Sequence, residues 1–307
     1  MIKEGVQMKI VVVGAGSVGM LVASFLSQSC QDVSLYVKRK EQAQQLQEQG
    51  LVRINLDGSL YKVQIKIRTD LLAIEENTLV IVAVKYGQLH DLYKRFETLS
   101  ANISLLFLQN GLAHYEEALK LPQKTIVFGS CQFGAERTNA YTVVHRGQGI
   151  VKLALGRGDH LVMDSILQRQ LENFQFRLEE NAEKMLFEKA LLNCFINPLT
   201  AILNVKNGEL VKNPHSEQLL ISLYDELMEA FPEEKSRFKL EDVKNLCRKT
   251  AMNTSSMLSD RLQNRPTEVE TIVGAVIRKA ARLGKNVPIL TTFYHLLLAL
   301  EESGEKM

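Results

Sequence analysis

The chain has 307 residues, enough for two domains that each bury a hydrophobic core. Hydrophobic residues make up 46% of it and charged residues 23%, and the formal net charge is +2. These values are ordinary for a globular protein, and a charge so close to neutral gives no reason to expect nucleic acid or a membrane surface as a partner. The four cysteines and six histidines are scattered without metal-binding spacing, which predicts reduced thiols in a cytoplasmic protein without a metal site.

The first residues of the sequence are not expected to be a signal peptide. The first seven residues, MIKEGVQ, are too polar for a signal peptide, and we expect them to precede a folded part that begins at Met8. No uninterrupted apolar run approaches the roughly 18 residues that a membrane-spanning helix requires. The sequence therefore predicts a protein without a membrane partner.

A glycine motif lies between the first predicted strand and the first predicted helix. Residues 8–13 have the pattern of a β-branched strand, residues 20–28 that of an amphipathic helix, and residues 33–37 that of a second strand. The intervening GAGSVG has the G-x-G-x-x-G spacing of a dinucleotide-binding turn, in which the helix N-terminus faces the pyrophosphate. The residues expected to hold a dinucleotide are Gly14, Ala15, Gly16, Ser17, Val18 and Gly19.

The residues after the second strand indicate which dinucleotide binds. NAD sites usually place an Asp or Glu about 20 residues beyond the glycine motif, where it bonds the ribose hydroxyls. Here the chain has Lys38-Arg39-Lys40 instead. A cluster of cations suits a 2′-phosphate, so we predict NADPH/NADP as the cofactor. The alternative is a solvated charge run that opens the next helix.

Two later strands end at polar residues. Residues 79–84 lead to Lys85, and residues 105–108 lead to Asn110. Ligands of open α/β sheets lie beyond the carboxyl ends of the strands, which makes Lys85 and Asn110 candidates for the cofactor edge. By position alone, the alternative for either residue is an ordinary loop residue. Other β structure is predicted as a hairpin over residues 51–67 and as strands over residues 125–130 and 149–155.

From about residue 161 onward the pattern predicts helices and no strand. The predicted helices cover residues 161–173, 183–204, 215–230, 239–252, 266–283 and 288–301. An α/β half followed by an all-helical half predicts two domains with a boundary near residue 178. We expect residues 1–178 to form a Rossmann-like NADP-binding domain and residues 179–307 a helical domain that binds substrate and carries out catalysis.

The predicted helix over residues 183–204 is apolar around its circumference except for one polar stripe. Lys189, Asn193 and Asn197 are spaced by four, which places them on one helical face. Pro198 lacks an N–H, so the helix is expected to kink or end beside Asn197. A buried unpaired polar group costs roughly 1–3 kcal/mol, which favours a binding site. The alternative is a lysine that reaches water beside two satisfied core amides.

Three more polar groups lie in the helical half. Asn207 opens a turn, a Ser255-Ser256 pair precedes an apolar run, and Glu268 lies in the first turn of the predicted helix over residues 266–283. Thr267 and Glu270 have the spacing of a capping box. Taken alone, these residues have the pattern of caps and turns.

Together these motifs resemble those of the ketopantoate reductases (2-dehydropantoate 2-reductases), over nearly the whole chain. The resemblance rests on GAGSVG from Gly14, VAVK ending at Lys85, QNG containing Asn110, K-x-x-x-N-x-x-x-NPLTA from Lys189, NGEL from Asn207, SSML from Ser255 and RPTEVE containing Glu268. Their order and spacing are far more specific than any one motif.

The resemblance implies a role for each matching residue. It implies that Lys189 is the general acid and that Glu268 binds the substrate hydroxyl beside this lysine. The other implied positions are Asn193, Asn197 and Asn207 in the substrate cleft, Ser256 rather than Ser255 at the substrate carboxylate, and Lys85 and Asn110 at the cofactor edge. Asn110 and Glu268 are expected to contact both substrate and cofactor. The 2′-phosphate cation falls at Lys38 or Arg39.

The implied activity is NADPH-dependent reduction of 2-dehydropantoate to (R)-pantoate in pantothenate and coenzyme A biosynthesis, by a monomer or homodimer. A cation at the keto oxygen stabilises the charge that develops during hydride transfer and can supply the proton. One alternative is a reductase of another small 2-keto acid, because a pocket distinguishes one apolar branch by only about 1–3 kcal/mol. A second alternative is a non-catalytic NADP-binding sensor, which would need neither the polar stripe nor Glu268.

Overall fold

The computed structural model describes residues 8–30, 32–71, 74–169 and 171–303, and the extension expected over residues 1–7 lies outside them. The chain forms two compact units. Unit 1 contains the described residues up to Gln109 together with His114–Met185, and unit 2 contains Asn110–Ala113 together with the described residues from Leu186 onward. The boundary expected near residue 178 lies before this division. The segment Asn110–Ala113 belongs to unit 2, although it follows a strand of unit 1.

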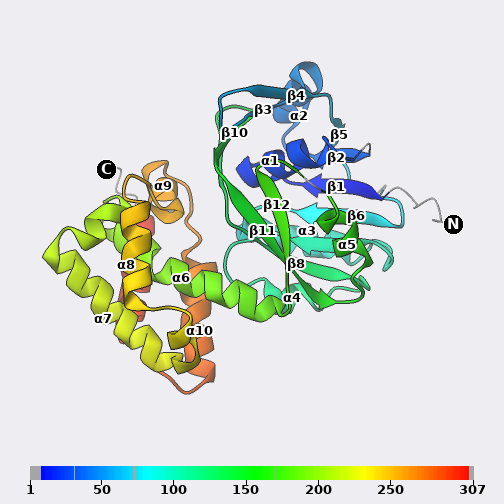
Figure 1. The fold of residues 1–307 in the computed structure, drawn as a ribbon. Helices are drawn as coiled ribbons and strands as arrows, with labels where there is room; N and C mark the ends of the chain where they lie inside the picture. The colour runs from blue at the N-terminus through cyan, green and yellow to red at the C-terminus, as the bar shows by residue number, and fades with distance from the viewer. Residues whose placement is uncertain (1–7, 31, 72–73, 170, 304–307) are drawn as a thin grey trace. The chain divides into compact units, whose positions relative to one another are not determined.

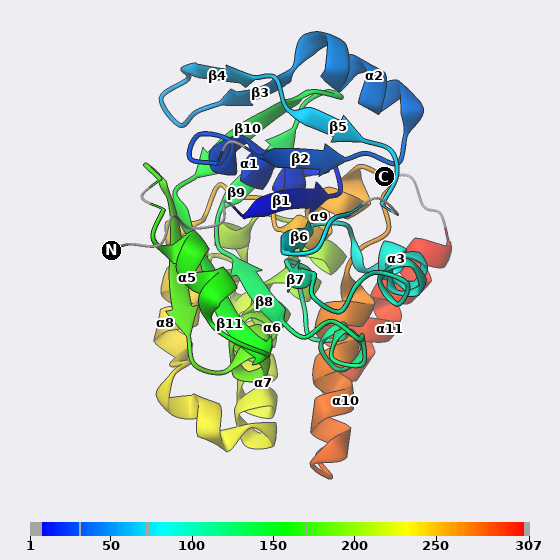
Figure 2. The same ribbon diagram turned by 90° about the vertical axis from the view of Figure 1, so that its right-hand side faces the viewer.

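Unit 1 is built on an eight-stranded sheet. Its strands are β1 (Lys9–Val13), β2 (Val33–Tyr36), β5 (Lys66–Arg68), β6 (Thr78–Val82), β7 (Ser104–Phe107), β8 (Ile126–Cys131), β11 (Gly149–Arg157) and β12 (Phe174–Glu179). Their order is β12-β11-β8-β7-β6-β1-β2-β5, and Figure 2 shows β5, β2, β1, β6, β7 and β8 following one another across the sheet. These six strands are parallel, whereas β11 is antiparallel to β8. The order reverses at β1, which confirms the predicted Rossmann-like fold.

A second sheet of unit 1 has the order β4-β3-β10-β9. Its strands are β3 (Leu51–Ile54), β4 (Leu60–Val63), β9 (Gly134–Arg137) and β10 (Thr142–Gly147). The predicted hairpin is confirmed, because β3 and β4 pair in antiparallel register. Helix α1 (Ser17–Leu26) contacts β1 and β2 of the large sheet and β3, β9 and β10 of the small one. Figure 1 shows α1 among these strands, and this packing explains why nearly all of its residues are buried.

One element of unit 1 contradicts the sequence prediction. The other helices of unit 1 are α2 (Lys40–Gln49), the 3₁₀-helix η1 (Tyr86–Gln88), α3 (Leu89–Phe96), α4 (Tyr115–Ala118) and α5 (Leu161–Leu167). The predicted helix over residues 161–173 ends at Leu167, and the prediction that no strand follows residue 161 is wrong. β12 forms because Phe174, Phe176 and Leu178 alternate with polar residues and the strand pairs in parallel with β11.

Unit 2 is helical and is organised around α6. Its elements are α6 (Ala182–Leu203), whose residues up to Met185 belong to unit 1, η2 (Asn207–Val211), α7 (Pro214–Ala230), η3 (Pro232–Ser236), α8 (Leu240–Lys249), α9 (Ser256–Leu262), η4 (Glu270–Gly274), α10 (Ala275–Arg282) and α11 (Pro288–Glu302). Leu191, Cys194 and Phe195 of α6 are fully buried in the core that α7, α8, α10 and α11 complete. Figure 1 shows α7, α8 and α10 around this helix.

A kink or an end of the helix is expected beside Asn197 from the sequence. Helix α6 does not end there, because it continues through Pro198. By length and mean hydropathy (1.3) α6 reaches the range of a membrane span, although the sequence shows no uninterrupted apolar run. Of the 18-residue stretch with this hydropathy, 72% is buried inside the structure, as expected for a core helix. The high apolar content of α6 is therefore explained by packing.

The helix predicted over residues 266–283 begins differently from expectation. Its first turn is the π-helix η4, and regular α-helix begins only with α10. The predicted capping box is wrong: the Glu270 carboxylate binds Arg278 and the Tyr294 hydroxyl instead of capping the helix start. The Thr267 N–H donates to Glu301 at 2.8 Å. Partners distant in sequence therefore replace the local cap.

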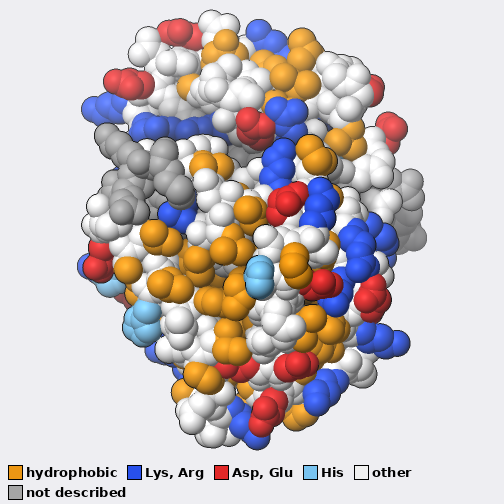
Figure 3. All heavy atoms as spheres, turned by 90° about the vertical axis from the view of Figure 1, so that its left-hand side faces the viewer, with side chains coloured by type: hydrophobic (Ala, Val, Ile, Leu, Met, Phe, Trp, Pro, Cys, Tyr) orange, Lys and Arg blue, Asp and Glu red, His pale blue; other side chains and the backbone are white. Residues whose placement is uncertain are grey.

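Positive and negative side chains are interspersed on the face drawn in Figure 3, with apolar side chains between them. This distribution agrees with the small formal net charge of +2. No broad field of one sign covers the described part of that face.

Candidate functional site

The glycine loop connects β1 to α1 and leaves room for a ligand at one position. A Cβ at Gly19 would overlap the carbonyl oxygen of Gly14, so the close packing of helix on loop requires glycine. At Gly16, by contrast, an added Cβ meets no atom within 4 Å. Packing within the chain therefore does not require glycine at position 16. Because Gly16 has no side chain, the space over its backbone stays open.

Gly16 is also the N-cap residue of α1, and none of the described side chains caps this helix end. The first N–H groups of a helix have no intrahelical acceptor, and they carry a partial positive charge. Ser17 and Val18 supply two of these groups, while Ala15 precedes the cap. The open space and the uncapped N–H groups together fit the pyrophosphate of a dinucleotide.

The two candidate cations for a 2′-phosphate follow β2 and differ in their contacts. Lys38 is exposed, and its side chain makes no hydrogen bond or ion pair with another described residue. Arg39 is the N-cap residue of α2, and its Nη2 donates to Gln42 Oε1 at 2.8 Å. Arg39 lines a pocket of about 280 Å³, whose other lining residues are Glu41, Gln42, Gln45, Arg137, Thr138, Asn139 and Ala140.

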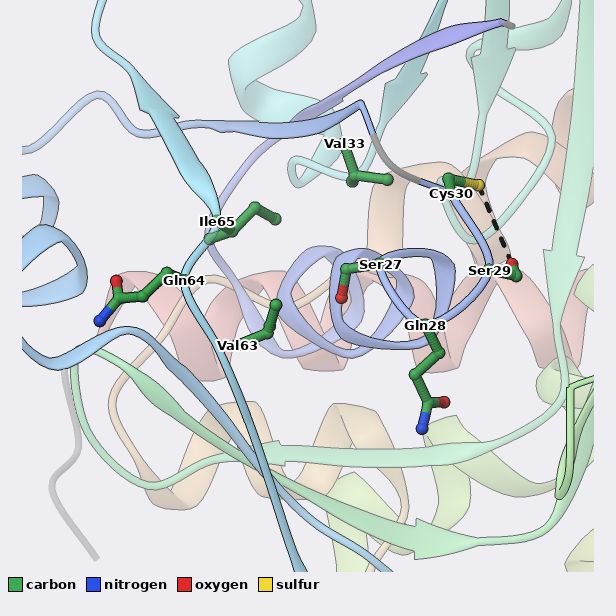
Figure 4. A pocket seen from close by; sticks show the side chains of 8 residues that line it. All are labelled: Ser27, Gln28, Ser29, Cys30, Val33, Val63, Gln64 and Ile65. Carbon is green, nitrogen blue, oxygen red and sulfur yellow. Dashed lines mark hydrogen bonds between the residues drawn. The ribbon is translucent and has the colours of Figure 1, made fainter.

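A second pocket of unit 1, of about 420 Å³, lies beyond the other end of α1. Figure 4 shows its lining, which consists of Ser27, Gln28, Ser29, Cys30, Val33, Val63, Gln64 and Ile65. None of these side chains is charged. The pocket therefore offers no cation for a phosphate group, and it lies at the opposite end of α1 from the glycine loop.

Polar residues follow the carboxyl ends of β6 and β7. Lys85 is exposed at the N-cap position of η1, just beyond β6. Gln109 is buried, and its Nε2 donates to Val82 O at 3.0 Å and to Val84 O at 2.9 Å. Gln109 thereby ties the chain after β7 to the chain that leads to Lys85. The sequence motif QNG contained Gln109 but gave no indication of this role.

Lys189, Asn110 and Glu268 form one hydrogen-bonded cluster within unit 2. Lys189 Nζ donates to Asn110 Oδ1 at 2.7 Å, and Asn110 Nδ2 donates to Glu268 Oε2 at 2.9 Å. All three side chains are half-buried. The structure thus brings together the predicted acid, the predicted hydroxyl-binding carboxylate and one predicted amide. A fixed ammonium in such a cluster can stabilise an oxygen that gains negative charge and can give it a proton.

The backbone around Gly111 positions Asn110 in this cluster. Gly111 has φ +83°, and a Cβ there would overlap the carbonyl oxygen of Thr271 in η4. The same Thr271 oxygen accepts from the Leu112 N–H at 3.0 Å. Widened π-turns frequently occur at functional sites, and this one begins at Glu270, two residues after Glu268. Thr271 could not be identified from the sequence, because a π-turn has no local motif.

The remaining residues of the polar stripe lead to the start of α9. Asn193 is half-buried and makes no side-chain hydrogen bond to another described residue. Asn197 is buried, and its Nδ2 donates to Ser256 Oγ at 3.4 Å. Ser256 is exposed, whereas the buried Ser255 caps α9 by accepting from the Leu258 N–H at 3.2 Å.

Asn207 lies apart from these contacts. It opens η2, it is 8% exposed, and its Nδ2 donates to Thr250 Oγ1 at 3.0 Å. Its Oδ1 finds no donor among the described residues. The structure therefore gives Asn207 a hydrogen bond to the end of α8. The described residues contain no group of three His, Cys, Asp or Glu side chains that could hold a metal ion.

Comparison with known proteins assigns the chain to a family. The family model "Ketopantoate reductase PanE/ApbA" matches residues 10–158, and "Ketopantoate reductase PanE/ApbA C terminal" matches residues 181–301. A protein of Listeria monocytogenes named 2-dehydropantoate 2-reductase is 34% identical over 303 residues, covering 97% of this chain and 99% of its own length. The chain belongs to the ketopantoate reductase family. Within this family, the Bacillus subtilis protein of the same name is 31% identical and covers 98% of this chain and 100% of its own length.

Solved structures share the fold. The crystal structure described as a probable 2-dehydropantoate 2-reductase from Bacillus subtilis superposes with a TM-score of 0.84 at 31% identity, covering 96% of this chain and 100% of its own. A ternary structure of D-mandelate dehydrogenase with NADH and anilino(oxo)acetate has a TM-score of 0.84 at 25% identity, covering 97% of this chain and 99% of its own. The fold of the ketopantoate reductase family therefore also occurs in a dehydrogenase with a different name.

Proposed function

We propose that this protein is a cytoplasmic enzyme that reduces 2-dehydropantoate to (R)-pantoate with NADPH, as a step in pantothenate and coenzyme A biosynthesis. The observation that carries the proposal is the hydrogen-bonded cluster of Lys189, Asn110 and Glu268. The names of relatives that are 31–34% identical over nearly the whole chain support the same substrate.

The proposed mechanism assigns the proton to Lys189. The nicotinamide, when bound, supplies the hydride. As the carbonyl carbon is reduced, its oxygen gains negative charge, which the Lys189 ammonium stabilises before donating a proton to that oxygen. Asn110 orients the ammonium by accepting from it at 2.7 Å. In this scheme Lys189 is the general acid.

Substrate recognition is proposed to use the polar groups around this cluster. A carboxylate has several acceptor positions, so Glu268 can bind Asn110 and a substrate hydroxyl together. Asn193 and the Asn197–Ser256 pair supply hydroxyl and amide donors suited to the substrate carboxylate. Ser256 is favoured over Ser255 because the Ser255 hydroxyl already caps α9. Asn207, whose side-chain oxygen accepts from none of the described residues, is proposed to help shape the same substrate site.

The cofactor is proposed to be bound by the glycine loop and the neighbouring strand ends. Gly14 to Gly19 are the proposed ligands of the pyrophosphate, Lys85 and Asn110 are proposed to contact the nicotinamide part, and Lys38 or Arg39 is the proposed ligand of the 2′-phosphate. Arg39 is the better supported of the two cations, because it lines a pocket and has a fixed contact with Gln42. Each charge-assisted hydrogen bond to the phosphate contributes about 1.5–3 kcal/mol, which favours NADPH over NADH.

The test is NADPH oxidation by the purified protein with a panel of 2-keto acids. We expect kcat/KM for 2-dehydropantoate to exceed that for 2-oxoisovalerate and pyruvate by a factor of about 100 or more, because these analogues leave Glu268 without the substrate hydroxyl. NADH in place of NADPH should give much lower kcat/KM. Equal turnover of 2-oxoisovalerate would refute the substrate assignment, and equal use of both cofactors would refute the NADPH preference.

A second candidate function is reduction of a bulkier 2-keto acid. The observation that favours it is the fold shared with D-mandelate dehydrogenase, at a TM-score of 0.84 and 25% identity. The panel should therefore include phenylglyoxylate, the keto acid that corresponds to mandelate. If phenylglyoxylate with NADH were the best pair, this candidate would replace the first.

A further inference from the structure

A second guanidinium lies beside Arg39, on a strand of the small sheet. Arg137 is the last residue of β9, and its side chain is exposed. Its Nη1 lies 3.4 Å from Gln42 Oε1, the same oxygen that accepts from Arg39 Nη2 at 2.8 Å. Arg137 Nη1 also lies 3.4 Å from the carbonyl oxygen of Ala15, in the glycine loop. Two cations far apart in the sequence therefore converge on one amide next to the dinucleotide loop.

The position of this amide is fixed by the fold. Gln42 is only 5% exposed, and its Nε2 donates to Ala15 O at 2.9 Å and to Ala140 O at 3.0 Å. Two carbonyl acceptors can bind only the NH₂ side of a glutamine amide, so the oxygen must face the two arginines. Gln42 thereby connects the glycine loop to the turn after β9 and holds both guanidinium groups in place.

Both arginines line the pocket of about 280 Å³, and the pocket contains one carboxylate, Glu41, which is exposed. The pocket lies beyond the carboxyl end of β2, the place where this fold positions the adenosine ribose. A phosphate that lies between two guanidinium groups is attracted by both of them. A guanidinium fork matches the geometry of a phosphate, with two parallel N–H donors.

We propose that Arg137 is a second ligand of the 2′-phosphate and, together with Arg39, determines the preference for NADP over NAD. This inference rests on the proposed NADPH dependence and adds to it a residue that lies outside the Lys38-Arg39-Lys40 cluster. The 2′-phosphate is held between the start of α2 and the end of β9, and Gln42 sets the spacing of its two arginines.

Binding of two nucleotide fragments tests the proposal without any turnover. Adenosine 2′,5′-bisphosphate carries the 2′-phosphate and 5′-AMP lacks it, so their affinities, measured by calorimetry, isolate this one group. Arg137→Ala should weaken binding of the bisphosphate about tenfold or more and change binding of 5′-AMP by less than about twofold. Arg39→Ala should act in the same direction. Arg137→Gln, which keeps much of the aliphatic stem, should reproduce the loss.

Arg146→Ala is the matched control. Arg146 is also an exposed arginine of the small sheet, on β10, but it does not line the pocket, and it is paired with Glu136 at 2.7 Å. Its removal should leave both affinities unchanged.

The possible results separate the two proposals. If Arg137→Ala and Arg137→Gln bind the bisphosphate as tightly as the unmodified protein, while Arg39→Ala loses affinity, the role of Arg137 is refuted and the NADPH preference stands. If the unmodified protein binds the bisphosphate no more tightly than 5′-AMP, the NADPH preference fails, and the role of Arg137 fails with it.

Discussion

The side-chain amide of Asn110 contacts two partners of opposite charge. Its oxygen accepts from the Lys189 ammonium at 2.7 Å, and its NH₂ group donates to the Glu268 carboxylate at 2.9 Å. Each end of the amide matches its partner, so a neutral group links a cation and an anion through two hydrogen bonds. Such a link holds the lysine in one orientation, because both ends of the amide are bonded.

The first mutational prediction concerns Lys189. If this residue is the general acid, Lys189→Ala should lower kcat by roughly 10²–10⁴ and leave NADPH affinity almost unchanged, because the proposed dinucleotide ligands other than Asn110 and Glu268 lie in unit 1. Steady-state kinetics and direct titration with NADPH measure the two effects separately.

Lys184 on the same helix provides the control. It is exposed and lies five residues earlier, about 140° around the helix from Lys189, so Lys184→Ala should have almost normal kinetics. A Lys189→Ala protein with full kcat would remove this lysine from the mechanism. If the variant instead unfolded, the lysine would be a structural residue.

At the scale of single elements, the glycine loop contains two glycines that are required for different reasons. Gly19 allows α1 to approach the loop, since a Cβ there would overlap the Gly14 carbonyl oxygen. Gly16 faces open space and has φ −85° and ψ −174°, a conformation that any residue can adopt. The two glycines of one motif should therefore respond differently to the same substitution.

We expect Gly19→Ala to destabilise unit 1 by about 1–3 kcal/mol, as overpacking does, and to lower its Tm by several degrees. Gly16→Ala should keep the Tm of the unmodified protein and weaken NADPH binding, because its methyl group enters the space proposed for the pyrophosphate. Thermal unfolding and NADPH titration of both variants give the comparison. A Gly16→Ala protein with normal NADPH affinity would count against this placement of the cofactor.

Elements defined by local patterns were predictable from the sequence, and those defined by distant partners were not. The glycine loop and the polar stripe of α6 depend on spacings within one element, so their residues could be named in advance. Glu270 has the local spacing of a capping box, but the fold offers it Arg278 and Tyr294, which are eight and 24 residues away. Arg137 reaches Ala15 across 122 residues, and no motif marks it. β12 has a clear alternation, which the helical pattern around it obscured.

At the scale of the whole molecule, the pH dependence of stability should include a large contribution from the buried His114. His114 is fully buried beside Phe107 and Phe128, and no described residue offers a hydrogen-bond partner to its ring nitrogens. Burial lowers the pKa of His114 to about 3 from its ordinary value of 6.5. The folded protein therefore keeps this ring neutral at pH values where the unfolded chain binds a proton.

The sign of the effect follows from proton uptake by the unfolded state. Above pH 6.5 neither state binds the proton, and between pH 6.5 and about 3 only the unfolded state does, so stability falls as the pH is lowered. From pH 7.5 to 5 the loss from His114 should be about 2 kcal/mol. In denaturant unfolding, the free energy of unfolding of His114→Leu should fall less between pH 7.5 and 5 than that of the unmodified protein, by this amount. His90→Gln, at an exposed histidine of α3, should lose as much unfolding free energy on acidification as the unmodified protein. An equal loss for His114→Leu and the unmodified protein would contradict the assignment.

The segment Asn110–Ala113 also limits how the gene for this protein can be divided or recombined. The chain enters unit 2 after Gln109, returns to unit 1 at His114 and leaves it again after Met185. A helical half expressed on its own would lack the acceptor for Lys189 and the Leu112 N–H that binds Thr271. Chimeras that exchange the two halves as cassettes should keep two folded cores and still lose the Lys189 cluster, unless the QNG segment is exchanged with the helices. Natural recombination faces the same constraint, so the two halves of this chain are expected to descend together.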